Sequence, residues 1–181
     1  MKKAYVFLAD GFEEVEGLTV VDLLRRAEIN VSMVSVSGEK QVKGSHGIVV
    51  EADLLYGQAN MEEADALILP GGMPGTRNLE AHAPLTRALK IANEQKKLLC
   101  AICAAPLVFG KNGILQGKKA CCYPGFEEDL LGADVCYEPV AKDGNVITSR
   151  GVGTAIAFAG EIITELVGKD IAEKIKEGIL A

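Results

Sequence analysis

Residues 98–106 read Leu98-Leu99-Cys100-Ala101-Ile102-Cys103-Ala104-Ala105-Pro106. Apolar residues followed by small ones and a proline predict a buried strand that turns sharply into a helix, with Cys103 at the corner. A side chain at such a turn stands clear of the sheet, as the serine of an α/β hydrolase does. Because a helix N-terminus favours negative charge, we expect a stabilised thiolate, which makes Cys103 a candidate nucleophile.

Buried strands alternate with helices along the rest of the chain. Strands are expected at 3–9, 31–36, 64–69, 98–102, 119–123 and 146–149. Helices are expected at 13–27, 105–111, 154–167 and 170–178, the last capped by Asp170, and residues 79–94 are expected to form one or two helices. Residues 41–52 indicate an antiparallel excursion, and residues 143–145 are a turn signal between the runs 140–141 and 146–149. Strands that are apolar throughout predict a mostly parallel sheet with helices on both faces. No repeat or linker interrupts the pattern, so we expect one α/β domain over residues 1–181.

Composition narrows the class of protein. The chain has 181 residues, 49% of them hydrophobic, and a net charge of −6. This charge argues against nucleic acid or an anionic membrane as a partner. The apolar run after Lys3 ends at Asp10, which is too short for a signal peptide or a membrane span. We therefore expect a cytoplasmic protein.

The five cysteines are an odd number, and most should be free thiols in the cytoplasm. Cys121, Cys122 and Cys136 are expected to be small apolar filler, and the alternative that one of them is a second oxidation site stays open. Cys100 and Cys103 form a C-x-x-C spacing, but an extended strand would separate their Cα atoms by roughly 10 Å, beyond disulfide reach. No second C-x-x-C is present to complete a zinc site, and no metal is expected.

Two further strand ends carry unusual residues. Sites in parallel sheets form at the carboxyl ends of the strands. Gly71 and Gly72 follow a strand, and the N–H group of Gly72 is a candidate oxyanion donor together with that of Ala104. At the first helix, Glu13 and Glu14 are expected to be solvated. Glu16 could turn inward and, if protonated, donate a hydrogen bond to sulfur.

The two histidines do not form a local Cys–His dyad. His82 lies in a polar helical segment and is expected at the surface, whereas His46 lies in the excursion between Gly44 and Gly47. The residues alone therefore identify no base for Cys103.

The chain resembles the ThiJ/PfpI superfamily, most closely the branch that contains the parkinsonism-associated redox protein and its bacterial relatives. The resemblance rests on segments that span nearly the whole chain in the family's order, namely 8–16, 21–27, 69–72, 101–106 and 148–154.

This resemblance implies a flavodoxin-like three-layer sandwich, a homodimer and no cofactor. It implies that Cys103 is the oxidation-sensitive nucleophile, bonded to a protonated Glu16, with Gly72 and Ala104 as the oxyanion pocket. Gly71, Arg26, His46, Tyr123 and Arg150 are the implied supporting residues. Arg26 and His46 fall where relatives have arginines around an anion-binding site, and Tyr123 falls where relatives often have a histidine.

Other functions of the superfamily fit less well. The intracellular-protease branch has histidine directly after the cysteine, where this chain has Ala104. Glutamine amidotransferases need a His-x-Glu pair, which is absent. No residue here supports the thiamine-biosynthesis label.

Three functions remain open. The first is a glyoxalase or deglycase, in which Cys103 attacks a small 2-oxoaldehyde such as methylglyoxal and Glu16 moves the proton. The second is an oxidative-stress sensor or redox-dependent chaperone, in which Cys103 becomes a sulfinate. The third is an oxidoreductase that uses Cys100 and Cys103.

Overall fold

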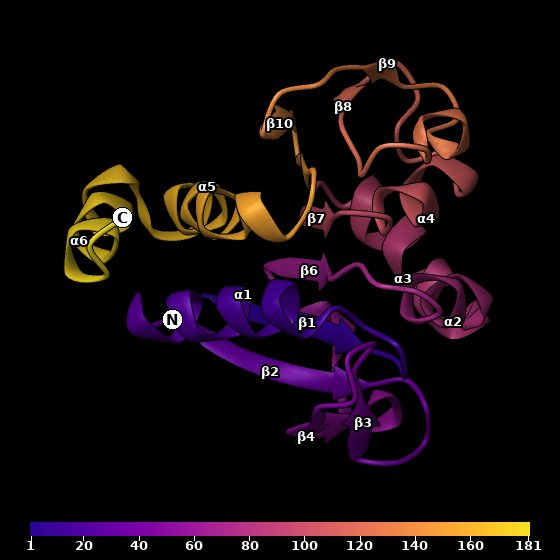
Figure 1. Ribbon diagram of the computed structural model, residues 1–181, viewed down its shortest axis with the longest axis horizontal. Coiled ribbons are helices and arrows are strands. Elements are labelled where there is room, and N and C mark those ends of the chain that lie inside the picture. The colour runs from indigo at the N-terminus through magenta and orange to yellow at the C-terminus, as the bar shows by residue number, and fades with distance from the viewer.

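The computed structural model describes all 181 residues and contains one large sheet. Its seven strands lie in the order β10-β11-β7-β6-β1-β2-β5, and every neighbouring pair is parallel except β10 with β11. Figure 1 shows β7, β6, β1 and β2 stacked in this order. The strands are β1 (Lys3–Leu8), β2 (Asn30–Ser35), β5 (Leu54–Leu55), β6 (Ala66–Leu69), β7 (Leu98–Ile102), β10 (Val140–Asp143) and β11 (Val146–Ser149).

Helices and two small sheets complete the chain. The helices are α1 (Glu14–Arg26), α2 (Gly75–Ala81), α3 (Ala83–Glu94), α4 (Pro106–Lys111), α5 (Ala155–Val167) and α6 (Lys169–Gly178). Short 3₁₀ turns are η1 (Tyr56–Gln58), η2 (Met61–Glu63), η3 (Glu127–Asp129) and η4 (Val152–Thr154). The small sheets pair β3 (Gln41–Lys43) with β4 (Val49–Glu51) and β8 (Lys119–Ala120) with β9 (Asp134–Val135).

The core has two halves, because successive residues of a strand point to opposite faces of the sheet. On β1, Val6 and Leu8 pack with α1 and α5, whereas Tyr5 and Phe7 pack with the layer of α2, α3 and α4. This confirms the predicted α/β sandwich with helices on both faces. No helix is long and apolar enough to cross a membrane.

Most expected elements are present. The antiparallel excursion at 41–52 is confirmed as β3–β4, and the predicted turn at 143–145 joins β10 and β11, which pair antiparallel. Three local predictions were wrong. The expected strand at 119–123 keeps ladder pairing only at Lys119–Ala120. Asp170 does not cap α6, whose cap residue is Gly168. His82 is no plain surface residue: its Nδ1 accepts from the N–H of Leu85 and caps α3, and its ring packs edge-on against Tyr56.

Candidate active site

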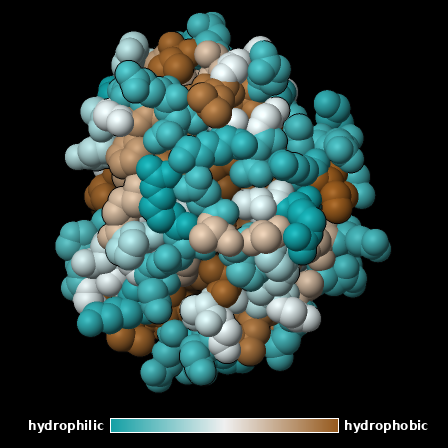
Figure 2. Space-filling model, turned by 90° about the vertical axis from the view of Figure 1, so that its right-hand side faces the viewer, coloured by the Kyte–Doolittle hydropathy of each residue, from teal (hydrophilic) through white to brown (hydrophobic).

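Three loops meet where the strand order reverses. The chain leaves β1 toward β2 and β5 on one side and returns as β6 on the other, so β1, β6 and β7 are neighbours. Their carboxyl ends point to the right in Figure 1 and lie on the face that Figure 2 shows. Glu16, Gly71 and Cys103 follow these three strands. A topological switch point of this kind is where open α/β sheets bind ligands.

Cys103 occupies a strained turn. Its φ angle is +64°, in the left-handed region that side chains with a Cβ rarely adopt. Two main-chain hydrogen bonds hold it there: its N–H donates to the carbonyl of Ser149 (3.0 Å), and its carbonyl accepts from the N–H of Tyr123 (2.8 Å). Cys103 is half-buried, in contrast to Cys100, which is buried in β7. Both are free thiols.

Gly71 provides room for the sulfur and the carboxyl group. A Cβ added to it would lie 2.5 Å from the Cβ of Cys103 and 2.7 Å from Oε2 of Glu16. Its N–H donates to that Oε2 at 2.9 Å. The second oxygen of Glu16, Oε1, is buried without a hydrogen-bond partner. An unpartnered carboxyl oxygen in a buried position is the natural place for a proton.

Glu16 and Cys103 shift each other's protonation. Burial raises the pKa of Glu16 to about 7, against the opposing hydrogen bonds from Gly71 and Cys103. Burial, and next the charge of Glu16, raise the pKa of Cys103 to about 12. This reverses the expectation of a stabilised thiolate, because the N–H groups of Gly72 and Ala104 lower that pKa by less than burial raises it. Protonation of Glu16 removes the repelling charge, so loss of the thiol proton is coupled to its gain by Glu16.

The expected oxyanion donors face the sulfur. The N–H groups of Gly72 and Ala104 both lower the pKa of Cys103, which favours its anionic form. Gly72 has a φ of +90°, and a Cβ there would clash with the backbone nitrogen of Glu13. Only glycine fits this position, which keeps the loop after β6 against the start of α1.

A cleft of about 960 Å³ opens above Cys103. Its lining includes Glu16, His46, Tyr123 and Arg150 together with Glu13, Val15, Pro124, Tyr137, Pro139 and residues 151–154. The structure thus brings together most of the residues that the sequence singled out. Figure 2 shows that the face at the strand ends is largely hydrophilic with scattered apolar side chains.

Arg150 and Tyr123 are positioned by the segments around β8 and β9. The Nε–H group of Arg150 donates to the carbonyl of Cys122 (3.3 Å), and its guanidinium lies 5.6 Å from the ring centre of Tyr137. Tyr123 is half exposed in the same wall. Tyr137 was missed by the sequence reasoning, because no motif or periodicity distinguishes it from a surface tyrosine.

Arg26 does not line the cleft within this chain, contrary to expectation. It lies in the last turn of α1 and pairs with Asp22 (Nε to Oδ2, 2.7 Å), with both side chains exposed. Glu16 lies in the first turn, so ten residues of helix, about 15 Å, separate the two. The family resemblance therefore placed Arg26 at the site wrongly, since it rested on the type of residue alone.

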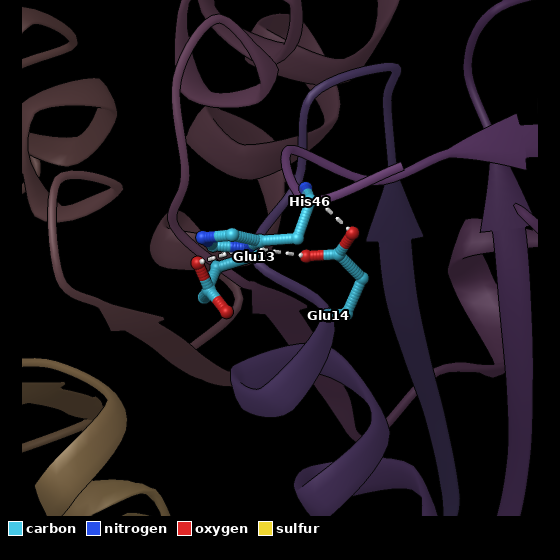
Figure 3. Close-up of side chains that lie close together, drawn as sticks. All are labelled: Glu13, Glu14 and His46. Atoms are coloured by element: carbon cyan, nitrogen blue, oxygen red, sulfur yellow. Dashed lines mark hydrogen bonds and ion pairs between the residues drawn. The ribbon is translucent and has the colours of Figure 1, made fainter. Parts of the chain in front are cut away.

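Glu14 was expected to be solvated, but it is 2% exposed. One oxygen accepts from the N–H groups of His46 (2.7 Å) and Ile48 (3.3 Å), and the other lies 3.0 Å from Nδ1 of His46 (Figure 3). Burial alone would raise the pKa of Glu14, but hydrogen bonds, including those from His46 and Ile48, outweigh it and lower the pKa to about 2. The bond to Glu14 raises the pKa of His46. Glu14 therefore clamps the β3–β4 hairpin onto α1.

The carboxylates of Glu13 and Glu14 and the ring of His46 are also the one cluster with metal-ligand spacing, since one ligand atom of each lies within 4.8 Å of the others. In Figure 3 the three side chains converge from the start of α1 and from the hairpin. Both oxygens of Glu14 accept hydrogen bonds within the protein, so they hold the hairpin in place.

An α/β sandwich with a cysteine on a strained strand-to-helix turn, beside a buried carboxyl group, defines a class of nucleophile-elbow proteins. The chain belongs to the DJ-1/PfpI family, whose model matches residues 2–165.

Relatives with known names are similar over most of this chain. Protein dj-1beta of Drosophila melanogaster is 37% identical over 99% of this chain and 97% of its own length. Protein DJ-1 homolog B of Arabidopsis thaliana is 38% identical, but the chain spans only 40% of its length. Among solved structures, oxidised DJ-1 of Toxoplasma gondii has a TM-score of 0.96 and 37% identity, with 99% of this chain and 98% of that chain covered.

One relative has a name that states an activity. A protein of Pyrococcus abyssi named a deglycase is 31% identical over 89% of this chain and 97% of its own length.

Proposed function

We propose that this protein is a cofactor-independent glyoxalase or deglycase that acts on small 2-oxoaldehydes such as methylglyoxal and on their early adducts. The observation that carries the proposal is the pair of Cys103 and Glu16. A strained, half-buried thiol lies beside a buried carboxyl group whose pKa is raised to about 7. A carboxyl group with a pKa near neutrality both accepts and returns a proton at physiological pH.

The reaction begins as the sulfur of Cys103 attacks the aldehyde carbon and its proton passes to Glu16. The resulting hemithioacetal oxygen is stabilised by the N–H groups of Gly72 and Ala104. Glu16 returns that proton to the hemithioacetal oxygen and is again a carboxylate. It then takes the proton from the former aldehyde carbon and delivers it to the neighbouring carbon, while the hydroxyl proton passes to the former ketone oxygen. The hemithioacetal thereby becomes a lactoyl thioester without an external oxidant. Water cleaves the thioester, giving lactate and the free thiol. Deglycation uses the same attack on an adduct and releases the amine or thiol.

The test is methylglyoxal consumption with lactate detection. We expect turnover by the wild type and none above the protein-free rate for Cys103→Ser. Glu16→Gln should lose about 10²- to 10⁴-fold in kcat, the usual contribution of a general base. Cys136→Ser, which leaves Cys103 and Glu16 intact, is the matched control. Full activity of Cys103→Ser would refute the proposal.

A second candidate function, redox sensing or redox-dependent chaperoning, uses the same thiol. Cys103 is accessible from the cleft, and a relative of 37% identity was solved in an oxidised form. Oxidation of Cys103 by one or two equivalents of peroxide, without aldehyde turnover in the wild type, would favour this function.

We also propose that the chain forms a homodimer. Its start of α1 and its β3–β4 hairpin expose apolar side chains next to each other: Val15 is 50% exposed, and Ile48 and Val49 are each 54% exposed. The hydrogen bond from Ile48 to Glu14 holds the two segments together. Sedimentation equilibrium at micromolar concentration should give twice the chain mass; a monomer at all concentrations would contradict this.

A further inference from the structure

Cys121 and Cys136 lie at corresponding ends of two short parallel strands outside the main sheet. In the β8–β9 pair, Lys119 is opposite Asp134 and Ala120 is opposite Val135. The cysteines immediately follow these two strands, and the N–H of Cys136 donates to the carbonyl of Ala120 at 2.9 Å, which continues the pairing by one residue. Figure 1 shows β8 and β9 side by side. The register therefore continues to place Cys121 opposite Cys136.

The two thiols share one face of this pair. Nζ of Lys119 binds Glu138 at 2.7 Å, and the pKa of Lys119 is raised first by Glu138 and then, to a smaller extent, by Cys136 and Asp134. Alternate residues of an extended chain point to the same side, so Cys121 lies on the face of Lys119 and Cys136 on the face of Asp134, which is opposite Lys119 in the register. Because Lys119 is opposite Asp134 and binds Glu138 of the segment that follows, both faces belong to the same side of the pair. Cys121 and Cys136 therefore lie on the same side.

The spacing suits a disulfide. Neighbouring strands run roughly 4.8 Å apart, within the range of Cα separations that a disulfide bridges. Cys100 and Cys103 fail this condition, since they lie three residues apart along the chain with Cys100 in a strand. Cys122, which follows Cys121, is buried in the core with α2, α3 and α4 and so faces away from the pair.

The two thiols differ in access to solvent. Cys136 is half-buried, whereas Cys121 is fully buried, with its sulfur 3.7 Å from Oγ1 of Thr148. An oxidant from solvent therefore reacts first with the thiol of Cys136. The buried thiol of Cys121 is the neighbour that reacts with the oxidised Cys136.

We propose that Cys121 and Cys136 form a reversible disulfide on exposure to hydrogen peroxide. Peroxide transfers one oxygen to Cys136, giving a sulfenic acid and one water. The sulfur of Cys121 then attacks the sulfenic sulfur, its proton leaves with the hydroxide as a second water, and the S–S bond forms. Two thiols are oxidised and one peroxide is reduced. The bond ties together the segments that carry Tyr123 and Tyr137, two residues of the cleft wall.

The experiment treats the full-length wild type, and separately the Cys103→Ser protein, with equimolar hydrogen peroxide. Free thiols are then alkylated and the chain is digested without reductant. Trypsin leaves all three cysteines in the peptide 120–142, so a glutamyl endopeptidase is added, which cleaves after Glu127 and Glu128 and separates Cys121 from Cys136. Mass spectrometry then detects a disulfide as a pair of linked peptides that dithiothreitol separates.

We expect the linked pair in the wild type, in Cys103→Ser and in the matched control Cys122→Ser. It should be absent from Cys121→Ser and Cys136→Ser. Three results would overturn the proposal: no linked pair in the wild type, a link that persists in Cys121→Ser, or a link that joins two chains on a non-reducing gel. Circular dichroism of each variant before oxidation confirms that it is folded, and the wild-type result stands without any variant.

Discussion

The Cβ of Cys103 lies where a side chain on Gly71 would have to go, since a Cβ on Gly71 would approach it to 2.5 Å. The loop after β6 and the turn after β7 are therefore packed at backbone contact. The reactive sulfur, the N–H groups and the carboxyl group of Glu16 depend on this contact for their geometry.

Gly71→Ala should disrupt the packing of the loop after β6 against the turn that carries Cys103. The added methyl group would clash with Cys103 and with Oε2 of Glu16, so we expect at least a tenfold loss of methylglyoxal turnover and a destabilisation of about 1–3 kcal/mol. Gly57→Ala is the control, because a Cβ there meets nothing within 4 Å. Steady-state kinetics and urea unfolding measure both effects. Equal activity of the two variants would contradict the packing argument.

The strain at Cys103 should be measurable as stability. Cys103→Gly and Cys103→Ala both remove the sulfur, but only glycine adopts a φ of +64° without strain. We expect the glycine variant to be more stable than the alanine variant by about 1 kcal/mol, the usual cost of the left-handed conformation for a residue with a Cβ. Urea unfolding of the pair tests this. A more stable alanine variant would show that the turn is not strained.

Glu16 should make stability fall as pH rises. Its pKa is about 7 in the folded chain and 4.5 ordinarily. Below pH 4.5 both states are protonated and the folded protein keeps its full stability. Between pH 4.5 and 7 the unfolded chain loses the proton first, so the wild type should lose about 3 kcal/mol relative to Glu16→Gln. The measurement is the difference in unfolding free energy at pH 4.5 and pH 8. A constant difference would mean that the pKa is not raised.

Glu14 should make folding stability rise as pH rises, the opposite of Glu16. Its pKa is about 2, below its ordinary 4.5, so its contribution is present above pH 4.5 and is lost as pH falls toward 2. Glu14→Gln should cost about 1–3 kcal/mol at pH 7, since a buried carboxylate loses hydrogen bonds from His46 and Ile48. The exposed Glu94→Gln is the control and should change stability by less than about 0.5 kcal/mol. Equal changes in stability for Glu14→Gln and Glu94→Gln would argue that Glu14 does not hold the β3–β4 hairpin onto α1.

Tyr123 should not act as a base. Its main-chain N–H, not its side chain, holds the carbonyl of Cys103, so the residue supports the nucleophile through its backbone. Tyr123→Phe should therefore change kcat/KM for methylglyoxal by less than about threefold. A loss of about a hundredfold, in the range of general acid–base catalysis, would assign the hydroxyl group a chemical role.

The local pattern of apolar and small residues was sufficient to predict the fold of the protein and the position of its reactive cysteine. Apolar strands alternating with helices predicted the parallel sheet, and the run from Leu98 to Pro106 placed Cys103 at the turn between β7 and α4. These features follow from the periodicity of side chains along one segment, which the sequence contains in full. Glu16 and Gly72 could also be named from the sequence, because they lie in segments that follow strands and that match the family.

Only the tertiary structure decided how these groups act on one another. The sequence predicted a stabilised thiolate, but burial and the neighbouring Glu16 raise the pKa of Cys103, because desolvation depends on what surrounds a group in space. Glu14 is buried by the hairpin that contains His46, 32 residues further along the chain, and Arg26 is carried away from the cleft by the length of α1. Contacts of this kind join segments that no local pattern relates.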